Sequence, residues 1–367
     1  MKRFQSIALV AFVALTVDVR FAVRSQAANG ATDYLHFDST YDGGWASGQN
    51  GGIGFGPWTL TATSGNPSMN GFFVGTSTNN GAGGSGIDTK VSTFPPPMDP
   101  LPRSWGLYAN NGNTAVAYRS LTGDRLAIGQ TVTLYMDNGY VDAGSYVGVI
   151  FRTGPGTTNK NDGSRLEFFF PGGNGNNDYY IADSNGVQNV NANVQLGDTP
   201  AHWTDSGLSL TFVLLTADTY RLHVATRQQN NGGLGPIDGL SNFGTGVTVT
   251  GTLAGVTGAG VNSIALYNQN AGNGAGNDLF FNGMSVSADP IPKITGMNVV
   301  GGTNAFISFT SISAEAYELQ SRDAMSTGSW ATVTNNIPGN GSTIQLQDAY
   351  PSTQTMRFYR VKGSYSF

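Results

Sequence analysis

The sequence contains no cysteine, and this absence excludes several classes of protein at once. A chain without thiols has no disulfide framework, no cysteine nucleophile and no zinc site built on sulfur. Helical periodicity is missing too, because no stretch repeats apolar residues every three or four positions. We therefore expect almost no helix. Stability must come from packing and, where carboxylates allow it, from a bound cation.

Charge is also scarce, since only 11% of the 367 residues are charged and the formal net charge is −5. Removal of residues 1–27 would take away four cations and one anion, which brings the net charge to −8. An acidic surface repels nucleic acid and anionic lipid. We therefore predict no nucleic-acid partner.

The N-terminus has the composition of an export signal. Lys2 and Arg3 precede an apolar run at 7–17, and a small-x-small triplet follows at 25–27. The apolar run is too short to span a bilayer. We predict a signal peptide over 1–27, cleaved after Ala27, no membrane insertion after its removal, and a bacterial protein that is secreted, extracellular or held at the cell surface.

Glycine, with 52 residues, and short alternating segments dominate what remains. Alternation with a period of two indicates antiparallel strands with one face buried, and the Gly-Asn, Asn-Gly and Asp-Gly pairs between them suit tight turns. We predict an all-β fold, an antiparallel jelly-roll β-sandwich. Its strands include YLHF (34–37), WTLTAT (58–63), GFFVG (71–75), YVGVIFR (146–152), SRLEFFF (164–170) and TYRLHVAT (219–226).

The chain divides at SADPIPK (287–293), where two prolines interrupt the strand pattern. We predict a large sandwich over 29–288, a linker over 289–293 and a second, small sandwich over 294–367. The five or six expected strands of the small sandwich suit an immunoglobulin-like or fibronectin type III-like module.

Three strings carry a family resemblance. IDTKVSTFPPPMDPLPRSWGLYANNG, LYMDNGYVDAGSYVGVIFRTG and NQNAGNGAGNDLFFNGMSV together resemble a group of uncharacterised secreted bacterial proteins with concanavalin A-like or laminin G-like jelly-roll modules. The Pro-rich insertion at 94–102 departs from the shorter connection expected there. The tail from Tyr317 to Val361 resembles the C-terminal sandwich modules of surface proteins. The resemblance implies a fold and an extracellular setting, and it supplies no catalytic residues.

Catalytic patterns are weak in the chain. Glycoside hydrolysis usually needs two carboxylates at a fixed separation, and Glu167 stands alone on its strand. A polysaccharide lyase centred on Tyr220, Arg221 and His223 is an alternative, although alternation places Tyr220 on the opposite strand face from the other two. We predict that the protein is not an enzyme.

Aromatic residues in turn-like contexts are the candidate ligand contacts, because rings stack on the C–H faces of sugars and exposed loops are where binding residues gather. The alternative is that these rings belong to the core. The candidates are Trp45, Trp58, Tyr179, Tyr180 and Trp203.

A structural calcium ion is a further hypothesis, since calcium binds carboxylate and carbonyl oxygens. Asp38 follows the first expected strand and Asp278 precedes the last, so the two could hold an ion between them. Asp137, Asn138 and Asp142 form a second set. The alternative for all five is hydrogen bonding within turns.

The sequence thus favours a secreted, non-catalytic protein that binds a carbohydrate or an extracellular matrix polymer at the bacterial cell surface. A structural or assembly protein of the envelope is the alternative from another class, because exposed strand edges can contact other chains.

Overall fold

The protein is described from a computed structural model. The described residues are 30–33, 35, 39–77, 103–122, 125–154, 160–173, 178–190, 207–226, 246–287, 292–311, 316–324, 329–340, 342–351 and 356–364. Trp203 and Asp38 lie outside them, as does most of the predicted linker.

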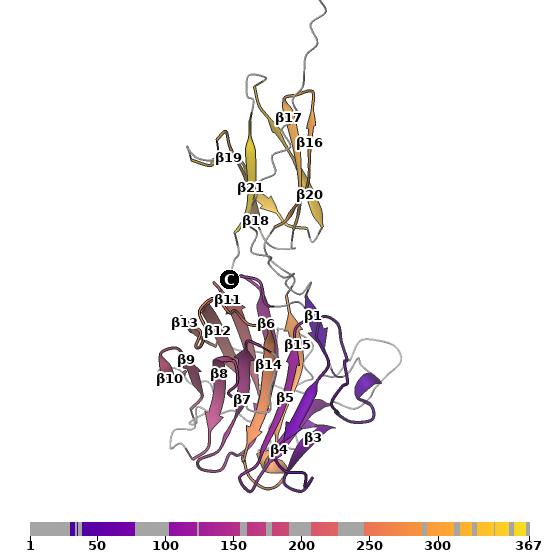
Figure 1. Ribbon diagram of the computed structural model, residues 1–367, viewed down its shortest axis with the longest axis vertical. Coiled ribbons are helices and arrows are strands. Elements are labelled where there is room, and N and C mark those ends of the chain that lie inside the picture. The colour runs from indigo at the N-terminus through magenta and orange to yellow at the C-terminus, as the bar shows by residue number, and fades with distance from the viewer. Residues whose placement is uncertain are drawn as a thin grey trace, which may run out of the picture.

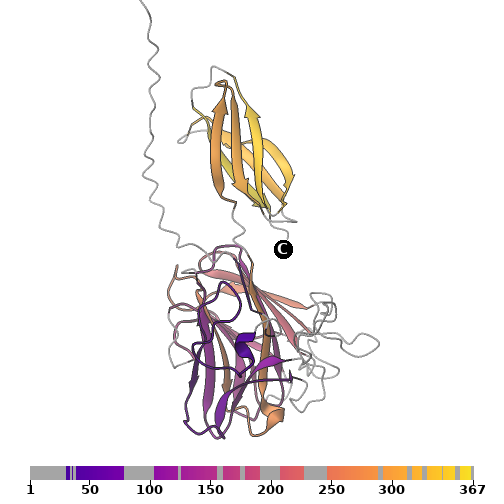
Figure 2. The same cartoon turned by 90° about the vertical axis from the view of Figure 1, so that its right-hand side faces the viewer.

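The N-terminal sandwich consists of two antiparallel sheets, which confirms the predicted fold class (Figures 1 and 2). The eight-stranded sheet has the order β13-β12-β11-β6-β15-β4-β3, and β1 also pairs with β15. Its strands are β1 (Ala31–Asp33), β3 (Asn70–Gly75), β4 (Ser104–Ala109), β6 (Thr131–Asn138), β11 (Leu208–Leu214), β12 (Thr219–Thr226), β13 (Val247–Thr252) and β15 (Leu279–Val286).

The seven-stranded sheet has the order β10-β9-β8-β7-β14-β5-β2, and most of these strands follow one another from left to right in Figure 1. Its strands are β2 (Thr59–Ala62), β5 (Thr114–Ser120), β7 (Tyr146–Arg152), β8 (Ser164–Pro171), β9 (Tyr180–Asp183), β10 (Gly186–Asn189) and β14 (Ser263–Gln269). Two single-turn 3-10 segments are η2 (Ser39–Tyr41) and η5 (Ala275–Asn277). Within the described residues, no helix is long and apolar enough to span a bilayer.

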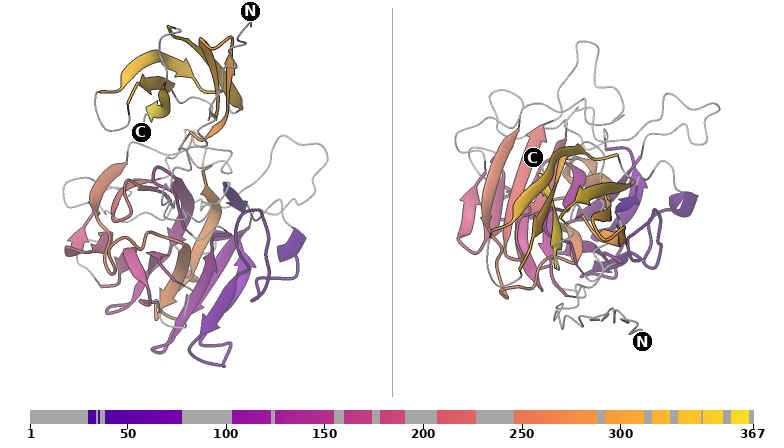
Figure 3. Two further views of the ribbon diagram at one scale, coloured as in Figure 1. Left: turned by 45° about the horizontal axis from the view of Figure 1, so that its top comes forward. Right: turned by 90° about the horizontal axis from the view of Figure 1, so that it is seen from above.

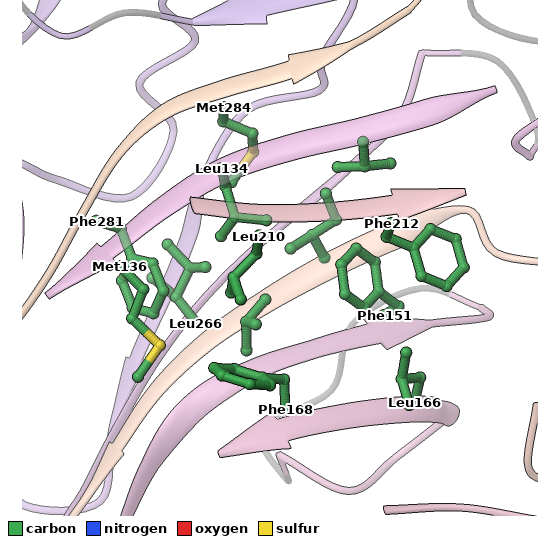
Figure 4. Close-up of a cluster of buried hydrophobic side chains, with 14 of the residues drawn as sticks. Leu134, Met136, Phe151, Leu166, Phe168, Leu210, Phe212, Leu266, Phe281 and Met284 are labelled. Atoms are coloured by element: carbon green, nitrogen blue, oxygen red, sulfur yellow. The ribbon is translucent and has the colours of Figure 1, made fainter. Parts of the chain in front are cut away.

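The core lies between the two sheets and follows from the alternation of side chains. In β6, Leu134 and Met136 point into the core, where they meet Leu210 and Phe281 of neighbouring strands (Figure 4). Phe151 stacks on Phe212 with ring centroids 4.3 Å apart, so the two sheets interlock through rings. Burial of this apolar surface is the main stabilising contribution.

Beside β1, a glycine stands at a position that only glycine can occupy. Gly52 has φ +72°, and a Cβ on it would lie 2.1 Å from the carbonyl oxygen of Thr32, so only glycine fits this close backbone approach. The strand predicted over 34–37 is not found at Leu35, which is in a 3-10 turn, and β1 instead covers Ala31–Asp33. The other residues of that prediction lie outside the described part of the chain.

The C-terminal sandwich has two three-stranded sheets, β16-β17-β20 and β19-β18-β21, and its own hydrophobic core (Figure 3). Its strands are β16 (Ile294–Val300), β17 (Asn304–Thr310), β18 (Ala316–Arg322), β19 (Ala331–Pro338), β20 (Thr343–Ala349) and β21 (Phe358–Ser364). Phe309, Tyr317 and Leu319 are buried at its centre.

Candidate functional site

The structure places three of the predicted sugar-contacting rings in the core. Trp45, Trp58 and Tyr179 are 6%, 1% and 0% exposed, so none of them offers a face to a ligand. The prediction for these residues was wrong because a turn-like sequence fixes the backbone and not the direction of a large side chain. Only Tyr180 of the described candidates is partly exposed.

The two tryptophans belong to an aromatic cluster at one end of the sandwich. Trp45 and Trp58 are in edge contact with centroids 5.0 Å apart, and Trp58 contacts Trp105 at 5.4 Å. The Nε1–H of Trp58 donates to the hydroxyl of Tyr41 at 3.0 Å. The three indoles pack against one another as a structural unit, and Trp58 is the one whose N–H has a hydrogen-bond partner among the described residues.

The residues of the lyase alternative are not brought together. Tyr220 is fully buried and its hydroxyl donates to Asp183 at 2.9 Å. Burial, together with that carboxylate, raises the pKa of Tyr220 well above its ordinary value, which opposes a role as base. His223 shares a hydrogen bond with Thr248 at 2.9 Å, and burial and then Arg221 lower the pKa of His223.

The residues of the calcium hypothesis do not form an ion-binding group in the described part of the chain. No set of three or more histidine, aspartate or glutamate side chains that could hold a metal lies there. Asp137 and Asn138 are successive residues of β6 and point to opposite faces, and Asn138 accepts a hydrogen bond from Tyr179 in the core at 3.1 Å. Asp142 is exposed.

Among the described members of these sets, Asp278 has a raised pKa. Its side chain is partly buried, and this desolvation raises its pKa to about 7. The folded protein therefore holds the proton of this carboxyl more tightly than the unfolded chain does. The free energy of unfolding should fall as pH rises from about 4 through about 7 and stay low above that.

Asp278→Asn should raise the free energy of unfolding at pH 8 by about 2 kcal/mol, because it removes a carboxylate that is costly to desolvate. The gain should disappear at pH 4, where the native carboxyl is protonated. Urea titrations at both pH values measure this. If calcium binds at Asp278, calcium instead stabilises the native protein at pH 8 and the variant loses that stabilisation.

Part of the outer face of the seven-stranded sheet forms the strongest candidate site. On this face the register aligns Tyr180 of β9, Phe169 of β8, Gly148 of β7 and Tyr267 of β14 in one row across the strands. Phe169 stacks on Tyr180 at 5.8 Å and meets the edge of Tyr146 at 6.0 Å. We call Tyr146, Phe169, Tyr180 and Tyr267 the ring row.

Glycine is required inside this row. A Cβ on Gly148 would lie 2.2 Å from the carbonyl oxygen of Phe168 and 2.9 Å from the Cβ of Phe169. The row from Tyr180 to Tyr267 crosses three strand spacings, roughly 14 Å.

A charged group lies beside the ring row. The carboxylate of Glu167 accepts hydrogen bonds from the Nζ of Lys160 at 2.9 Å and from the hydroxyl of Tyr267 at 2.5 Å. Lys160 also lies 4.4 Å from the centroid of the Tyr267 ring. Burial, and then the charge of Glu167, raise the pKa of Tyr267 well above its ordinary value, so its hydroxyl stays a donor.

This site combines rings with a few fixed polar groups. The side chains of Lys160 and Glu167 are 16% and 15% exposed, and Tyr146 and Tyr180 are partly exposed. Apolar surfaces with a small number of oriented polar groups are typical of sites that bind organic ligands. Phe169 and Tyr267 are 7% and 0% exposed, so they support the row from beneath and only Tyr146 and Tyr180 offer ring surface for C–H groups. Lys160 and Glu167 offer an ammonium and a carboxylate for hydroxyl groups.

Sequence reasoning found Glu167 and Tyr180 but missed Tyr146, Phe169, Tyr267 and Lys160. A signal for them was present. SRLEFFF places Glu167 and Phe169 on the face opposite to Phe168, and a strand that is apolar on both faces has its outer face covered or in contact with something.

Comparison with known proteins adds little to this site. No family model matches the chain, and no curated protein matches it in sequence. Among solved structures, the glycoside hydrolase domain of Endo-D from Streptococcus pneumoniae R6 is 12% identical with a TM-score of 0.27, over 83% of this chain and 37% of that chain.

Two further structures are similar at the same level. The calcium-bound exoplasmic/lumenal domain of VIP36 is 11% identical with a TM-score of 0.32, over 55% of this chain and 88% of that chain. The binding domain of botulinum neurotoxin serotype D is 8% identical with a TM-score of 0.29, over 63% of this chain and 47% of that chain. TM-scores this low carry no argument about function.

Proposed function

We propose that the protein binds a glycan chain along the ring row, as a secreted, non-catalytic protein of the bacterial cell surface. The observation that carries this proposal is the alignment of partly exposed Tyr146 and Tyr180 with the Lys160–Glu167–Tyr267 group on one sheet face. The N-terminal signal pattern supports the extracellular setting.

The absence of catalysis is part of the same proposal. The carboxylate of Glu167 accepts two hydrogen bonds, one from the ammonium of Lys160 and one from the hydroxyl of Tyr267. A carboxylate fixed in this way orients a hydroxyl group and is poorly suited to donate a proton to a leaving group. The ligand is therefore bound and not cleaved.

The experiment is retention of the purified protein on a broad panel of immobilised polysaccharides, with and without calcium. We expect retention on at least one neutral polysaccharide, independent of calcium because the described part of the chain shows no metal-binding group. Lack of retention on every member of the panel would contradict the proposal.

Replacement of two rings should weaken that binding. Tyr146→Ala/Tyr180→Ala removes two partly exposed rings. At about 0.5–1.5 kcal/mol for each ring, we expect affinity to fall between about fivefold and about 150-fold. Tyr140→Ala is the matched control, because Tyr140 is 58% exposed on the loop between β6 and β7 and is not part of the ring row. Isothermal titration with the retained polysaccharide measures both variants. Equal losses in the two would show that the ring row is not the site.

A further inference from the structure

A third partly exposed tyrosine lies on the outer face of the seven-stranded sheet. Tyr118 of β5 packs against the apolar cluster that contains Phe169 and Tyr267, and Tyr146 and Tyr180 pack against the same cluster. Tyr118 is not part of the ring row and stands at the other side of the face, on the strand next to the edge strand β2. The three partly exposed rings therefore share one continuous apolar floor.

The register places Tyr118 in the same row across the strands as Glu167. Tyr118 lies opposite Ala265 of β14, which lies opposite Ile150 of β7, and Ile150 lies opposite Glu167 of β8. Ala265 and Ile150 are both fully buried. The hydrogen-bonded carboxylate of Glu167 thus lies between Tyr118 on β5 and Tyr180 on β9.

The separation of the two outer rings indicates the size of ligand that would contact both. β5 and β9 are four strand spacings apart in the sheet, which is roughly 19 Å. A single sugar cannot contact Tyr118 and Tyr180 at once over this distance. A linear chain of several sugars can, and its middle part would then cross Glu167.

Polar groups accompany Tyr118 at the sheet edge. Thr59 of β2 lies directly opposite Tyr118, and Thr61 is two residues further along the same strand. Leu60 between them packs against the core, so both threonines are on the outer face, where they are partly exposed. Their hydroxyls can donate to and accept from the hydroxyl groups of a sugar. This end of the face therefore combines a ring with a few polar groups, as the ring row does.

A buried arginine fixes the position of Tyr118. Arg152 is fully buried, and its Nε donates to the carbonyl oxygen of Asp162 at 2.7 Å. Its guanidinium carbon lies 5.8 Å from the centroid of the Tyr118 ring, within the range of a cation–π contact. A ring that is held in this way loses less conformational freedom when a ligand binds to it.

We infer that Tyr118 and the two threonines form a second subsite for the same glycan, which runs across the strands from Tyr180 over Glu167 to Tyr118. This inference rests on the proposed function. The ligand class that it names is a linear, uncharged glycan chain that extends beyond the ring row. The middle sugars meet the ion pair of Lys160 and Glu167, which offers hydrogen bonds to hydroxyl groups and no net charge to an acidic sugar.

The dependence of affinity on ligand length tests this inference. Oligosaccharides of increasing length, prepared from the retained polysaccharide, are titrated calorimetrically against the full chain. Tyr118→Leu removes the ring and keeps apolar volume on the cluster. We expect it to weaken binding of long oligosaccharides between about twofold and about twelvefold, the range for one ring. Binding of short ones should not change, which also shows that the variant is folded.

Two further variants sharpen the test. Thr59→Val/Thr61→Val removes both hydroxyls, keeps the branched side chains, and should likewise weaken only the long oligosaccharides. Tyr140→Leu is the matched control and should change binding at no length, because Tyr140 is on the loop between β6 and β7.

Two results would overturn the inference: unchanged binding of long oligosaccharides by Tyr118→Leu, or an equal loss for short and long ones. The ring row would keep its own test in either case, because Tyr146→Ala/Tyr180→Ala weakens binding at every length if the proposed function is right. Lack of retention on every polysaccharide would instead contradict the proposed function, and the second subsite would fall with it.

Discussion

Arg119→Ala should lower the free energy of unfolding by about 3–5 kcal/mol, the range expected when one partner of a buried ion pair is removed. Arg119 and Asp33 have side chains that are 0% exposed and 2.5 Å apart. The same guanidinium donates to the carbonyl oxygens of Gly56 and Gly51 at 3.0 and 3.1 Å. The variant leaves a carboxylate and two carbonyl groups buried without this donor.

The double-mutant cycle with Asp33→Ala isolates the pair. We expect Asp33→Ala/Arg119→Ala to lose clearly less stability than the two single variants together, because the cost of a buried unpaired charge is then absent. Arg125→Ala is the matched control, since Arg125 is exposed and donates to the carbonyl of Gly258 at 3.0 Å. Urea unfolding measures all four. Additive losses would show that the ion pair does not couple β1 to β5.

Trp58→Ala should also cost about 3–5 kcal/mol, the usual range for removal of a buried aromatic side chain. The ring contacts Trp45 and Trp105 and lies 4.7 Å from the guanidinium of Arg119. A cavity at this point would loosen the aromatic cluster and the buried ion pair together.

Trp58→Phe is the companion variant, because it keeps one aromatic ring in the core while it removes the hydrogen bond to Tyr41 and the second ring of the indole. We expect a smaller loss for it in the same urea unfolding experiment. The opposite result would be a Trp58→Ala variant with unchanged stability and no glycan binding. That result would support the prediction that Trp58 contacts the ligand, which its buried position contradicts.

The fold was predictable because alternation is a local property. In β6, every second residue from Val132 to Asn138 is in the core, as the sequence pattern indicates. The order of strands was not predictable, since it depends on pairings such as that of β15 with β6 across more than a hundred residues. Nothing in either segment alone specifies the other.

The candidate site was only partly predictable for a related reason. Glu167 and Tyr267 are 100 residues apart and meet only because β8 and β14 both pair with β7. Trp45 was predicted as a ligand contact because its Gly-rich segment indicates an exposed turn, but its ring lies in the core. Side-chain direction in a turn depends on where the loop packs, and that is a property of the whole sandwich.

Hydroxyl-radical footprinting tests the central claim most directly, because it reports the accessibility of individual tyrosine side chains. With a retained polysaccharide bound, we predict slower oxidation of Tyr146 and Tyr180 and unchanged oxidation of Tyr140. Protection confined to loop residues, with Tyr146 and Tyr180 oxidised at the same rate in the free and bound protein, would contradict a glycan site on this sheet face.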